Sequence, residues 1–175
     1  MNTYKTVMID PPWPQSKSGL RLVRPNQERA LDYPIMTLDE IRALPIRSLC
    51  DGLVFLWTID KFMVQAHQIL KDWGFKKHCI FVWNKSNGMC PFSVRFTNEY
   101  MLMGYTGKLT LKKIGVSTHF SGASSRHSEK PEEAYKVIET IAFPPYLEMF
   151  ARRERGKAGK FGATKLILVY LSICR

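Results

Sequence analysis

The chain has 175 residues, 45% of them hydrophobic, which is enough for one domain with its own core. Its four cysteines lack the paired spacing of zinc ligands or of a disulfide framework, and no apolar run is long enough to span a membrane, so we expect neither a metal site nor a membrane partner. The net charge of +11 favours nucleic acid as a partner, although residues 152–175 alone carry seven basic residues and one glutamate.

The first predicted strand, residues 4–9, runs directly into Asp10-Pro11-Pro12-Trp13. The two prolines fix an extended corner that presents backbone carbonyls. A carboxylate and a carbonyl can accept the two N–H bonds of an amino group, while the indole stacks on a planar ring. The tetrapeptide therefore suits a planar ligand with an amino group. By itself it fits a Pro-Pro turn with a buried tryptophan equally well.

The chain then alternates polar loops with periodic segments. Residues 15–32 are polar and basic, as in a solvated loop or in a loop that contacts phosphate. Thr37 and Glu40 form a capping-box pattern at the start of a short helix that ends near Pro45. The elements predicted next are a doubly buried strand over 52–58 and an amphipathic helix over 62–73 closed by Gly74.

The second half predicts three strands and one helix. The helix begins between Ser128, a candidate cap, and Pro131, and the polar residues 84–97 are predicted to be a loop. The three strands are residues 78–83, 99–105 and 146–151. Strands that alternate with helices predict an α/β sheet with helices on its faces. Ligands of such sheets bind beyond the carboxyl ends of the strands, where the Pro-Pro corner lies.

Eight sequence blocks follow one another between residues 7 and 152. They are Val-Met-Ile-Asp-Pro-Pro-Trp (7–13), Tyr-Pro-Ile-Met-Thr-Leu-Asp-Glu-Ile (33–41), Leu-Val-Phe-Leu-Trp-Thr (53–58), Asp-Trp-Gly-Phe (72–75), Val-Trp-Asn-Lys-Ser-Asn (82–87), Asn-Glu-Tyr-Met-Leu-Met-Gly (98–104), Arg-His-Ser-Glu-Lys-Pro-Glu-Glu (126–133) and Tyr-Leu-Glu-Met-Phe-Ala-Arg (146–152). In this order the chain resembles the MT-A70 family of S-adenosylmethionine-dependent N6-adenine methyltransferases, in its short phage or bacterial form.

The resemblance implies a Rossmann-like methyltransferase sheet with helices on both faces and a permuted motif order, the catalytic motif coming first. It implies that S-adenosylmethionine is the methyl donor and that the N6 amine of adenine in nucleic acid is the acceptor. DNA is the expected nucleic acid, because the short form resembles phage and bacterial modification enzymes. The acceptor base must be single-stranded or flipped out, since a base inside a duplex cannot present its amine.

The same resemblance assigns roles to individual residues. Asp10 and the Pro11 carbonyl would accept the amine hydrogens, and Trp13 would line the base pocket beside Pro12. The other residues carried over to the acceptor side are Tyr33, Trp57, Lys85 and Glu99, and those on the cofactor side are Asp10, Ser128, Lys130, Glu148, Phe150 and Arg152. A solvated Lys130, a purely capping Ser128 and a purely core role for Trp57 and Phe150 are the structural alternatives.

Other functions and settings remain open at this point. The same fold also fits a catalytically inactive nucleic-acid-binding or partner subunit, although the acidic motif is intact. A third alternative is methylation of an amine in a small molecule or of a protein amide. We expect a cytoplasmic location in a bacterium or a phage-infected host, and a homo-oligomer is compatible with the sequence.

The C-terminal tail departs from the family, whose members close with a Gly-Trp-x-x-Trp-Gly-Asn-Glu stretch at the cofactor. Residues 156–175 contain no such stretch. Codons for residues 157–165 can, however, be chosen so that a reading shifted by one nucleotide gives Gly-Trp-Glu-Val-Trp-Gly-Asn-Glu. We therefore hypothesise a methyltransferase domain over residues 1–155 followed by a frameshifted tail. A divergent natural strand over residues 166–171 is the alternative.

The gene sequence tests the frameshift. The codons for residues 157–165 are expected to be compatible with AAG-GCT-GGG-AAG-TTT-GGG-GCA-ACG-AAG, and codons incompatible with the shifted register would contradict it. Because the altered motif holds the cofactor in the family, calorimetry is expected to find weak or absent S-adenosylmethionine binding. Normal affinity would refute that consequence.

Overall fold

The computed structural model describes residues 3–14, 35–89, 94–123 and 130–150. They form a six-stranded sheet in the order β5-β3-β4-β2-β1-β6. Strand β4 is antiparallel to both of its neighbours, and every other neighbouring pair is parallel. The strands are β1 (Tyr4–Ile9), β2 (Cys50–Thr58), β3 (Lys76–Met89), β4 (Phe96–Tyr105), β5 (His119–Ser121) and β6 (Tyr146–Met149), and the helices are α1 (Leu38–Arg42), α2 (Ile46–Leu49), the 3-10 helix η1 (Asp60–Phe62), α3 (Met63–Asp72) and α4 (Glu132–Ile141).

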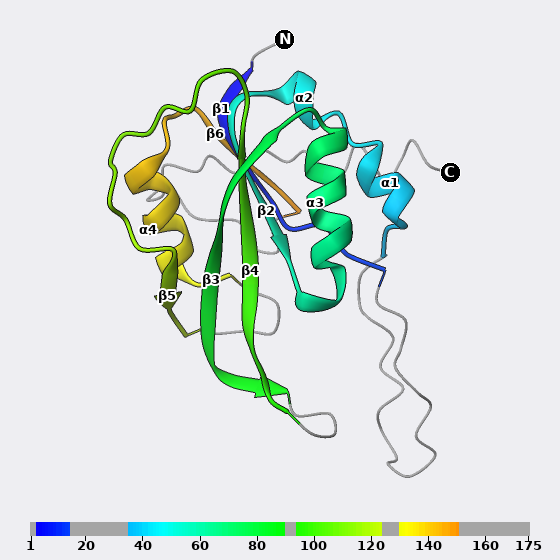
Figure 1. The fold of residues 1–175 in the computed structure, drawn as a ribbon, viewed down its shortest axis with the longest axis vertical. Coiled ribbons are helices and arrows are strands. Elements are labelled where there is room, and N and C mark those ends of the chain that lie inside the picture. Colours follow the sequence, from blue (N-terminus) through cyan, green and yellow to red (C-terminus); the bar gives the residue numbers. More distant parts are fainter. Residues whose placement is uncertain (1–2, 15–34, 90–93, 124–129, 151–175) are drawn as a thin grey trace.

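Helices cover both faces of the sheet, with α1, α2 and α3 on one side and α4 on the other (Figure 1). Side chains alternate between the two faces along each strand. In β2, Val54 and Leu56 therefore join the core beneath α1–α3, whereas Phe55 and Trp57 join the core beneath α4. Burial on both faces explains the continuous apolar run of this strand. The predicted α/β class with helices on both faces is confirmed.

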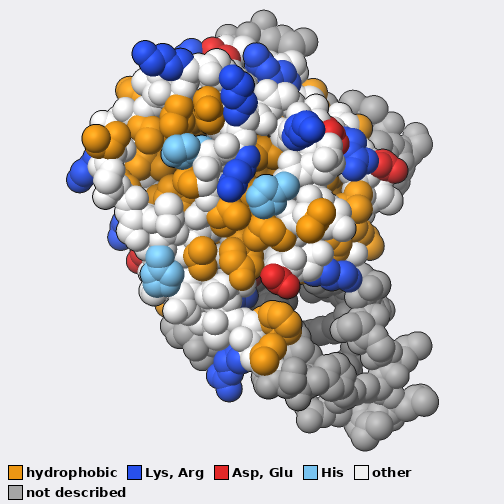
Figure 2. All heavy atoms as spheres, viewed as in Figure 1, with side chains coloured by type: hydrophobic (Ala, Val, Ile, Leu, Met, Phe, Trp, Pro, Cys, Tyr) orange, Lys and Arg blue, Asp and Glu red, His pale blue; other side chains and the backbone are white. Residues whose placement is uncertain are grey.

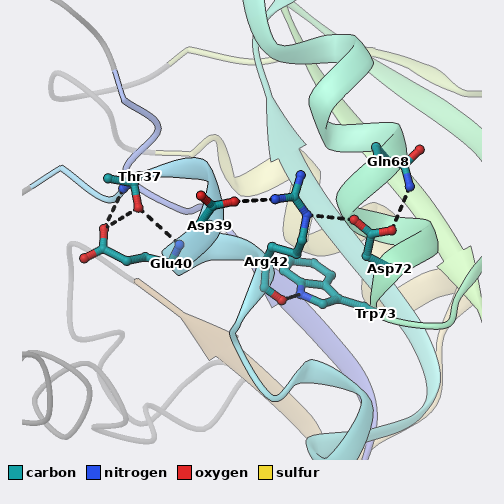
Figure 3. A network of polar contacts seen from close by, with 7 residues as sticks. All are labelled: Thr37, Asp39, Glu40, Arg42, Gln68, Asp72 and Trp73. Atoms are coloured by element: carbon teal, nitrogen blue, oxygen red, sulfur yellow. Dashed lines mark hydrogen bonds and ion pairs between the residues drawn. The ribbon is translucent and has the colours of Figure 1, made fainter.

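The capping box predicted at the start of α1 is present (Figure 3). The Glu40 backbone N–H donates to the Thr37 hydroxyl oxygen at 3.2 Å, and the Thr37 backbone N–H donates to the Glu40 carboxylate at 2.6 Å. Just before this cap, the Met36 N–H donates to the Pro12 carbonyl at 2.9 Å. The start of α1 is thereby attached to the Pro-Pro corner.

A polar network then ties the end of α1 to the end of α3 (Figure 3). The Arg42 guanidinium lies between Asp39 and Asp72, with Nε 2.8 Å from the Asp72 carboxylate. The Asp72 carboxylate also accepts from Gln68 at 2.7 Å, and the Trp73 indole N–H donates to the Arg42 carbonyl at 3.0 Å. The two helices are therefore fixed to one another at the same end.

The prediction of a loop over residues 84–97 is wrong for residues 84–89 and 96–97, and residues 90–93 lie outside the described residues. Strand β3 continues to Met89 and β4 begins at Phe96, so the chain forms a hairpin that extends beyond the rest of the sheet (Figure 1). Pairing of Asn84 with Asn98 and of Met89 with Phe96 builds this extension. A ribbon beyond the helix layers has no core face, so its sequence lacks the apolar alternation that predicts strands.

The remaining differences are smaller. The short β5 and α2 were not predicted, because a few residues carry too little periodicity. Helix α4 begins at Glu132 after Pro131, which makes no side-chain cap, and the predicted cap Ser128 lies outside the described residues. Strand β6 ends at Met149, two residues earlier than predicted, because Phe150 adopts a left-handed φ of 64°. Among the described residues, no helix is long and apolar enough to cross a membrane.

Two glycines of the central strands make a testable comparison. A Cβ on Gly52 would lie 2.2 Å from the backbone oxygen of Lys5 in β1, whereas a Cβ on Gly104 would meet the flexible end of Leu70 at 2.9 Å. A side-chain tip can move aside, but a paired strand cannot, so Gly52→Ala is expected to destabilise the fold by about 2–3 kcal/mol and Gly104→Ala by about 1 kcal/mol. Urea unfolding of both variants measures this, and equal or reversed effects would contradict the packing.

Candidate active site

Side chains of β1, β2 and β4 meet at one edge of the sheet. Met8, Trp57 and Met101 all belong to the core beneath α4. Asp10 follows Met8 by two residues, and Glu99 precedes Met101 by two residues on the antiparallel strand β4. Because side chains alternate, Asp10 and Glu99 point to the α4 face at the carboxyl edge of β1 and β2.

Lys130 joins these residues from the segment just before α4. Its Nζ lies 3.0 Å from Asp10 Oδ2 and 3.0 Å from Glu99 Oε2. The same ammonium lies over the indole of Trp57, 4.7 Å from the ring centroid, within the range of a cation–π contact. The Lys130 side chain is only 10% exposed. One buried cation therefore links two carboxylates that come from different strands.

Lys85 adds a second cation to Glu99. Its Nζ lies 2.8 Å from Glu99 Oε1 and over the ring of Trp83 at 5.7 Å from the centroid. Trp83 in turn meets Trp57 edge to face, with ring centroids 6.1 Å apart. Negative and positive side chains thus alternate in the order Asp10, Lys130, Glu99 and Lys85, and their net charge is zero. The two lysines lie over the rings of Trp57 and Trp83.

The ionisation states follow from this arrangement. Burial opposes the negative charge of Glu99, but Lys130 and Lys85 outweigh burial and hold its pKa below the ordinary value of 4.5. Burial likewise opposes the positive charge of Lys130, but the carboxylates of Asp10 and Glu99 outweigh it and raise its pKa above 10.5. The Glu99–Lys130 pair is therefore ionised throughout the neutral range.

The Pro-Pro corner is built by hydrogen bonds. The Pro11 carbonyl accepts from the Trp13 N–H at 2.8 Å, and the Pro12 carbonyl accepts from Met36. The Trp13 indole is 5% exposed, stacks on Phe62 with centroids 5.3 Å apart, and donates from Nε1 to the Trp57 carbonyl at 3.0 Å. Trp13 therefore attaches the corner to the end of β2 and is largely buried.

Glu148 and Phe150 lie at the carboxyl end of β6, beside β1. Glu148 pairs with Met8 in register, and its Oε1 accepts a 2.8 Å hydrogen bond from the Tyr135 hydroxyl. Phe150 packs partly buried against the core beneath α1–α3 despite its φ of 64°. Such a conformation is strained for a bulky residue and is concentrated at functional sites.

The structure thus brings Asp10, Trp57, Lys85, Glu99 and Lys130 into one cluster, with the corner and Glu148 on adjacent strands. The candidates Tyr33, Ser128 and Arg152 lie outside the described residues. Sequence reasoning missed Trp83 and Tyr135, which looked like ordinary core residues of a strand and a helix. Their polar contacts join distant segments, so no local pattern signals them.

The residues present fit S-adenosylmethionine. The carboxylates of Asp10 and Glu148 and the buried Lys130 ammonium, all near the carboxyl edge, match the charged amino-acid group and the sulfonium of this cofactor. The indole Nε1 of Trp57 is buried there without a hydrogen-bond partner in the described structure, and such a group invites a ligand atom or an ordered water. No group of three or more His, Cys, Asp or Glu among the described residues is placed to hold a metal ion.

Comparisons with known proteins agree on one family. The sequence model of MT-A70 matches residues 4–164. The Arabidopsis thaliana N(6)-adenosine-methyltransferase MT-A70-like is 31% identical over 170 residues, covering 91% of this chain and 23% of the plant protein. The Homo sapiens N(6)-adenosine-methyltransferase catalytic subunit METTL3 is 28% identical over 152 residues, covering 81% of this chain and 24% of METTL3.

A bacterial relative is matched over more of its length. The type II methyltransferase M.MunI of Mycoplasma sp is 29% identical over 174 residues, covering 85% of this chain and 72% of M.MunI. The chain therefore spans about a quarter of the plant and human relatives but most of the bacterial one.

Removing the central ammonium tests the electrostatics of the cluster. Lys130→Met is expected to lower the free energy of unfolding at neutral pH by about 2–3 kcal/mol, because it leaves two partly buried carboxylates close together without the cation between them. Lys85→Met, which removes a more exposed cation, is expected to cost about 1 kcal/mol. Urea unfolding at a series of pH values measures both.

The pH dependence of the stability deficit tests whether charge repulsion causes it. The pKa of Glu99 is lowered in the folded protein, so its contribution is complete above 4.5 and is lost as the pH falls through the folded value. The deficit of Lys130→Met is therefore expected to be largest at neutral pH and to shrink below pH 4.5, where protonation relieves the repulsion. A deficit independent of pH would refute this account.

Proposed function

The chain belongs to the MT-A70 family, and from that premise we propose that it transfers a methyl group from S-adenosylmethionine to the N6 amine of adenine in DNA. The observation that carries the proposal is the buried charge cluster beside the Pro-Pro corner. Lys130 holds Asp10 and Glu99 together at the carboxyl edge of the sheet, where α/β folds bind their ligands.

Asp10 and the corner act on the acceptor amine. This amine is a weak nucleophile, because its lone pair is delocalised into the adenine ring. Asp10 accepts one N–H, and the Pro11 carbonyl accepts the other through the lone pair that Trp13 leaves unused. Holding both hydrogens favours the pyramidal nitrogen that attacks the methyl group.

The carboxylates also stabilise the charge that develops. Positive charge grows on N6 as the new C–N bond forms and the C–S bond of the methyl group breaks. In this proposal the Asp10 carboxylate stabilises that charge and accepts the proton that the product amine releases. Lys130 keeps Asp10 and Glu99 in fixed positions before the reaction, so little reorganisation is needed.

Other residues divide between the two ligands. Glu99, Lys85, Trp57, Tyr33 and Trp13 surround the acceptor base in this proposal. S-adenosylmethionine, when bound, supplies an electrophilic methyl group on a sulfonium. The residues proposed to hold it are Asp10, Lys130, Glu148 and Phe150, together with Ser128 and Arg152.

One observation favours a nucleic acid and a second favours DNA. Lys and Arg side chains are spread over the face seen in Figure 2, with Asp and Glu side chains among them, and the net charge of +11 favours a polyanion of either kind. The chain also matches 72% of a bacterial type II methyltransferase. A cytoplasmic site of action in a bacterium or a phage-infected host, with or without assembly into a homo-oligomer, completes the proposal.

Methylation in cells tests the function. DNA from a host that lacks adenine methylation is expected to contain N6-methyladenine when this chain is expressed with its tail repaired, and less of it or none when the chain is expressed as it stands. Mass spectrometry and methylation-sensitive digestion measure both. Asp10→Asn keeps the size of the side chain but removes its charge, and is expected to lower methylation about 100- to 1000-fold.

Asp51→Asn is the matched control. Asp51 pairs with Lys5 at 2.7 Å at the opposite end of β2, so its loss is expected to leave methylation unchanged. N6-methyladenine in RNA but not in DNA would overturn the choice of substrate. Nucleic-acid binding without methylation, with the tail repaired, would favour the inactive binding subunit instead.

A further inference from the structure

We propose that Tyr135 is a positioning residue for the donor side of the site. Its hydroxyl fixes the Glu148 carboxylate in the orientation in which that carboxylate accepts hydroxyl groups of a nucleoside ribose. This inference rests on the proposed function, because it takes the methyl donor as the ligand of Glu148.

The contact between the two residues is well defined. Tyr135 lies in α4, is 9% exposed, and packs in the core beneath that helix. Its hydroxyl donates to Glu148 Oε1 at 2.8 Å across the gap between α4 and β6. A hydrogen bond to a carboxylate is stronger than one between neutral groups. Because the core holds the tyrosine ring, the hydroxyl keeps a fixed position. The bond therefore restrains Oε1 of the Glu148 carboxylate.

Helix α4 connects this contact to the acceptor side. Lys130 lies two residues before α4, and Tyr135 lies in its first turn. Between them, the ring of Pro131 fixes its own φ and restricts Lys130. Lys130 reaches Asp10 in β1, and Tyr135 reaches Glu148 in the neighbouring strand β6. The residues at the start of α4 therefore contact Asp10 at the end of β1 and Glu148 in the adjacent strand β6.

The chemistry of Glu148 indicates what it would hold. A carboxylate accepts hydrogen bonds and donates none, so its partners on a nucleoside are hydroxyl or amino groups. A ribose offers two neighbouring hydroxyls, which match the two oxygens of a carboxylate. Removing the Tyr135 hydroxyl leaves the ring packed but removes one hydrogen bond that orients the carboxylate, so a ligand must then supply more of that restraint on binding.

Tyr135→Phe tests the inference through binding rather than turnover. Calorimetry with S-adenosylhomocysteine is expected to show about tenfold weaker affinity than for the parent chain. Glu148→Gln is expected to weaken affinity at least as much, and adding Tyr135→Phe to it is expected to change nothing further. The weakening by Tyr135→Phe is expected to vanish for the 2′,3′-dideoxyribose analogue, a result that a merely structural role would not produce.

Tyr146→Phe is the matched control. Tyr146 is buried on the same face of the sheet, but its hydroxyl donates to the Ala142 carbonyl at 2.8 Å, away from the carboxyl edge. Its loss is expected to leave affinity unchanged. The measurements use this chain and, if its affinity is below detection, the tail-repaired chain. If the unsubstituted chain binds S-adenosylhomocysteine and Tyr135→Phe binds it equally well, the inference about Tyr135 is wrong and the proposed function stands. If neither this chain nor the tail-repaired chain binds it, the proposed function is wrong.

Discussion

Lys130 brings a positive charge into the carboxyl edge of the sheet, where burial alone would favour a neutral amine. Asp10 and Glu99 reverse that preference, and the indole face of Trp57 adds a contact that needs no hydrogen bond. The charged members are stable only together, because removing any one of them leaves an uncompensated charge. The five members of the cluster come from five separate segments of the chain, so strands β1 to β4 must be assembled before the cluster exists.

The direction of β4 makes this assembly possible. In an all-parallel sheet, Glu99 at the start of its strand would lie at the amino edge, far from Asp10. Because β4 runs antiparallel to β2, its first residues arrive at the carboxyl edge, where β1 and β2 end. The hairpin that joins β3 to β4 supplies Lys85 on the way out and Glu99 on the way back. Because β4 is reversed, Glu99 in β4 and Lys85 in β3 lie at the same edge of the sheet.

Much of this could be predicted from the sequence, and the limits have physical causes. The strand before Asp10, the capping box at Thr37 and the buried strand through Trp57 are local patterns, and each was found where predicted. The ion pairs of Lys130 depend on strand register and direction, which local patterns do not encode. Lys85 illustrates the difference: it was a candidate residue from the resemblance, yet it lies in a strand that hydropathy predicted as a loop.

Tyr135 shows a second limit. Its position in α4 fits the apolar face of an amphipathic helix, and that is where most of its ring lies. A tyrosine can satisfy such a pattern with its ring and still direct its hydroxyl to a distant carboxylate. The pattern therefore describes the burial of the residue correctly and says nothing about Glu148, which only the packing of α4 on β6 brings within reach.

The extended hairpin of β3 and β4 has a consequence for how such proteins diverge. Between Asn84 and Met89, five steps along β3 oppose two steps along β4 from Asn98 to Phe96, so the ribbon already accommodates strands of unequal length. Lys85 and Glu99 pair at its base, where the sheet holds the register. Insertions and deletions further out can therefore be absorbed without moving this ion pair. A longer or a shorter hairpin is therefore compatible with the same ion pair at its base.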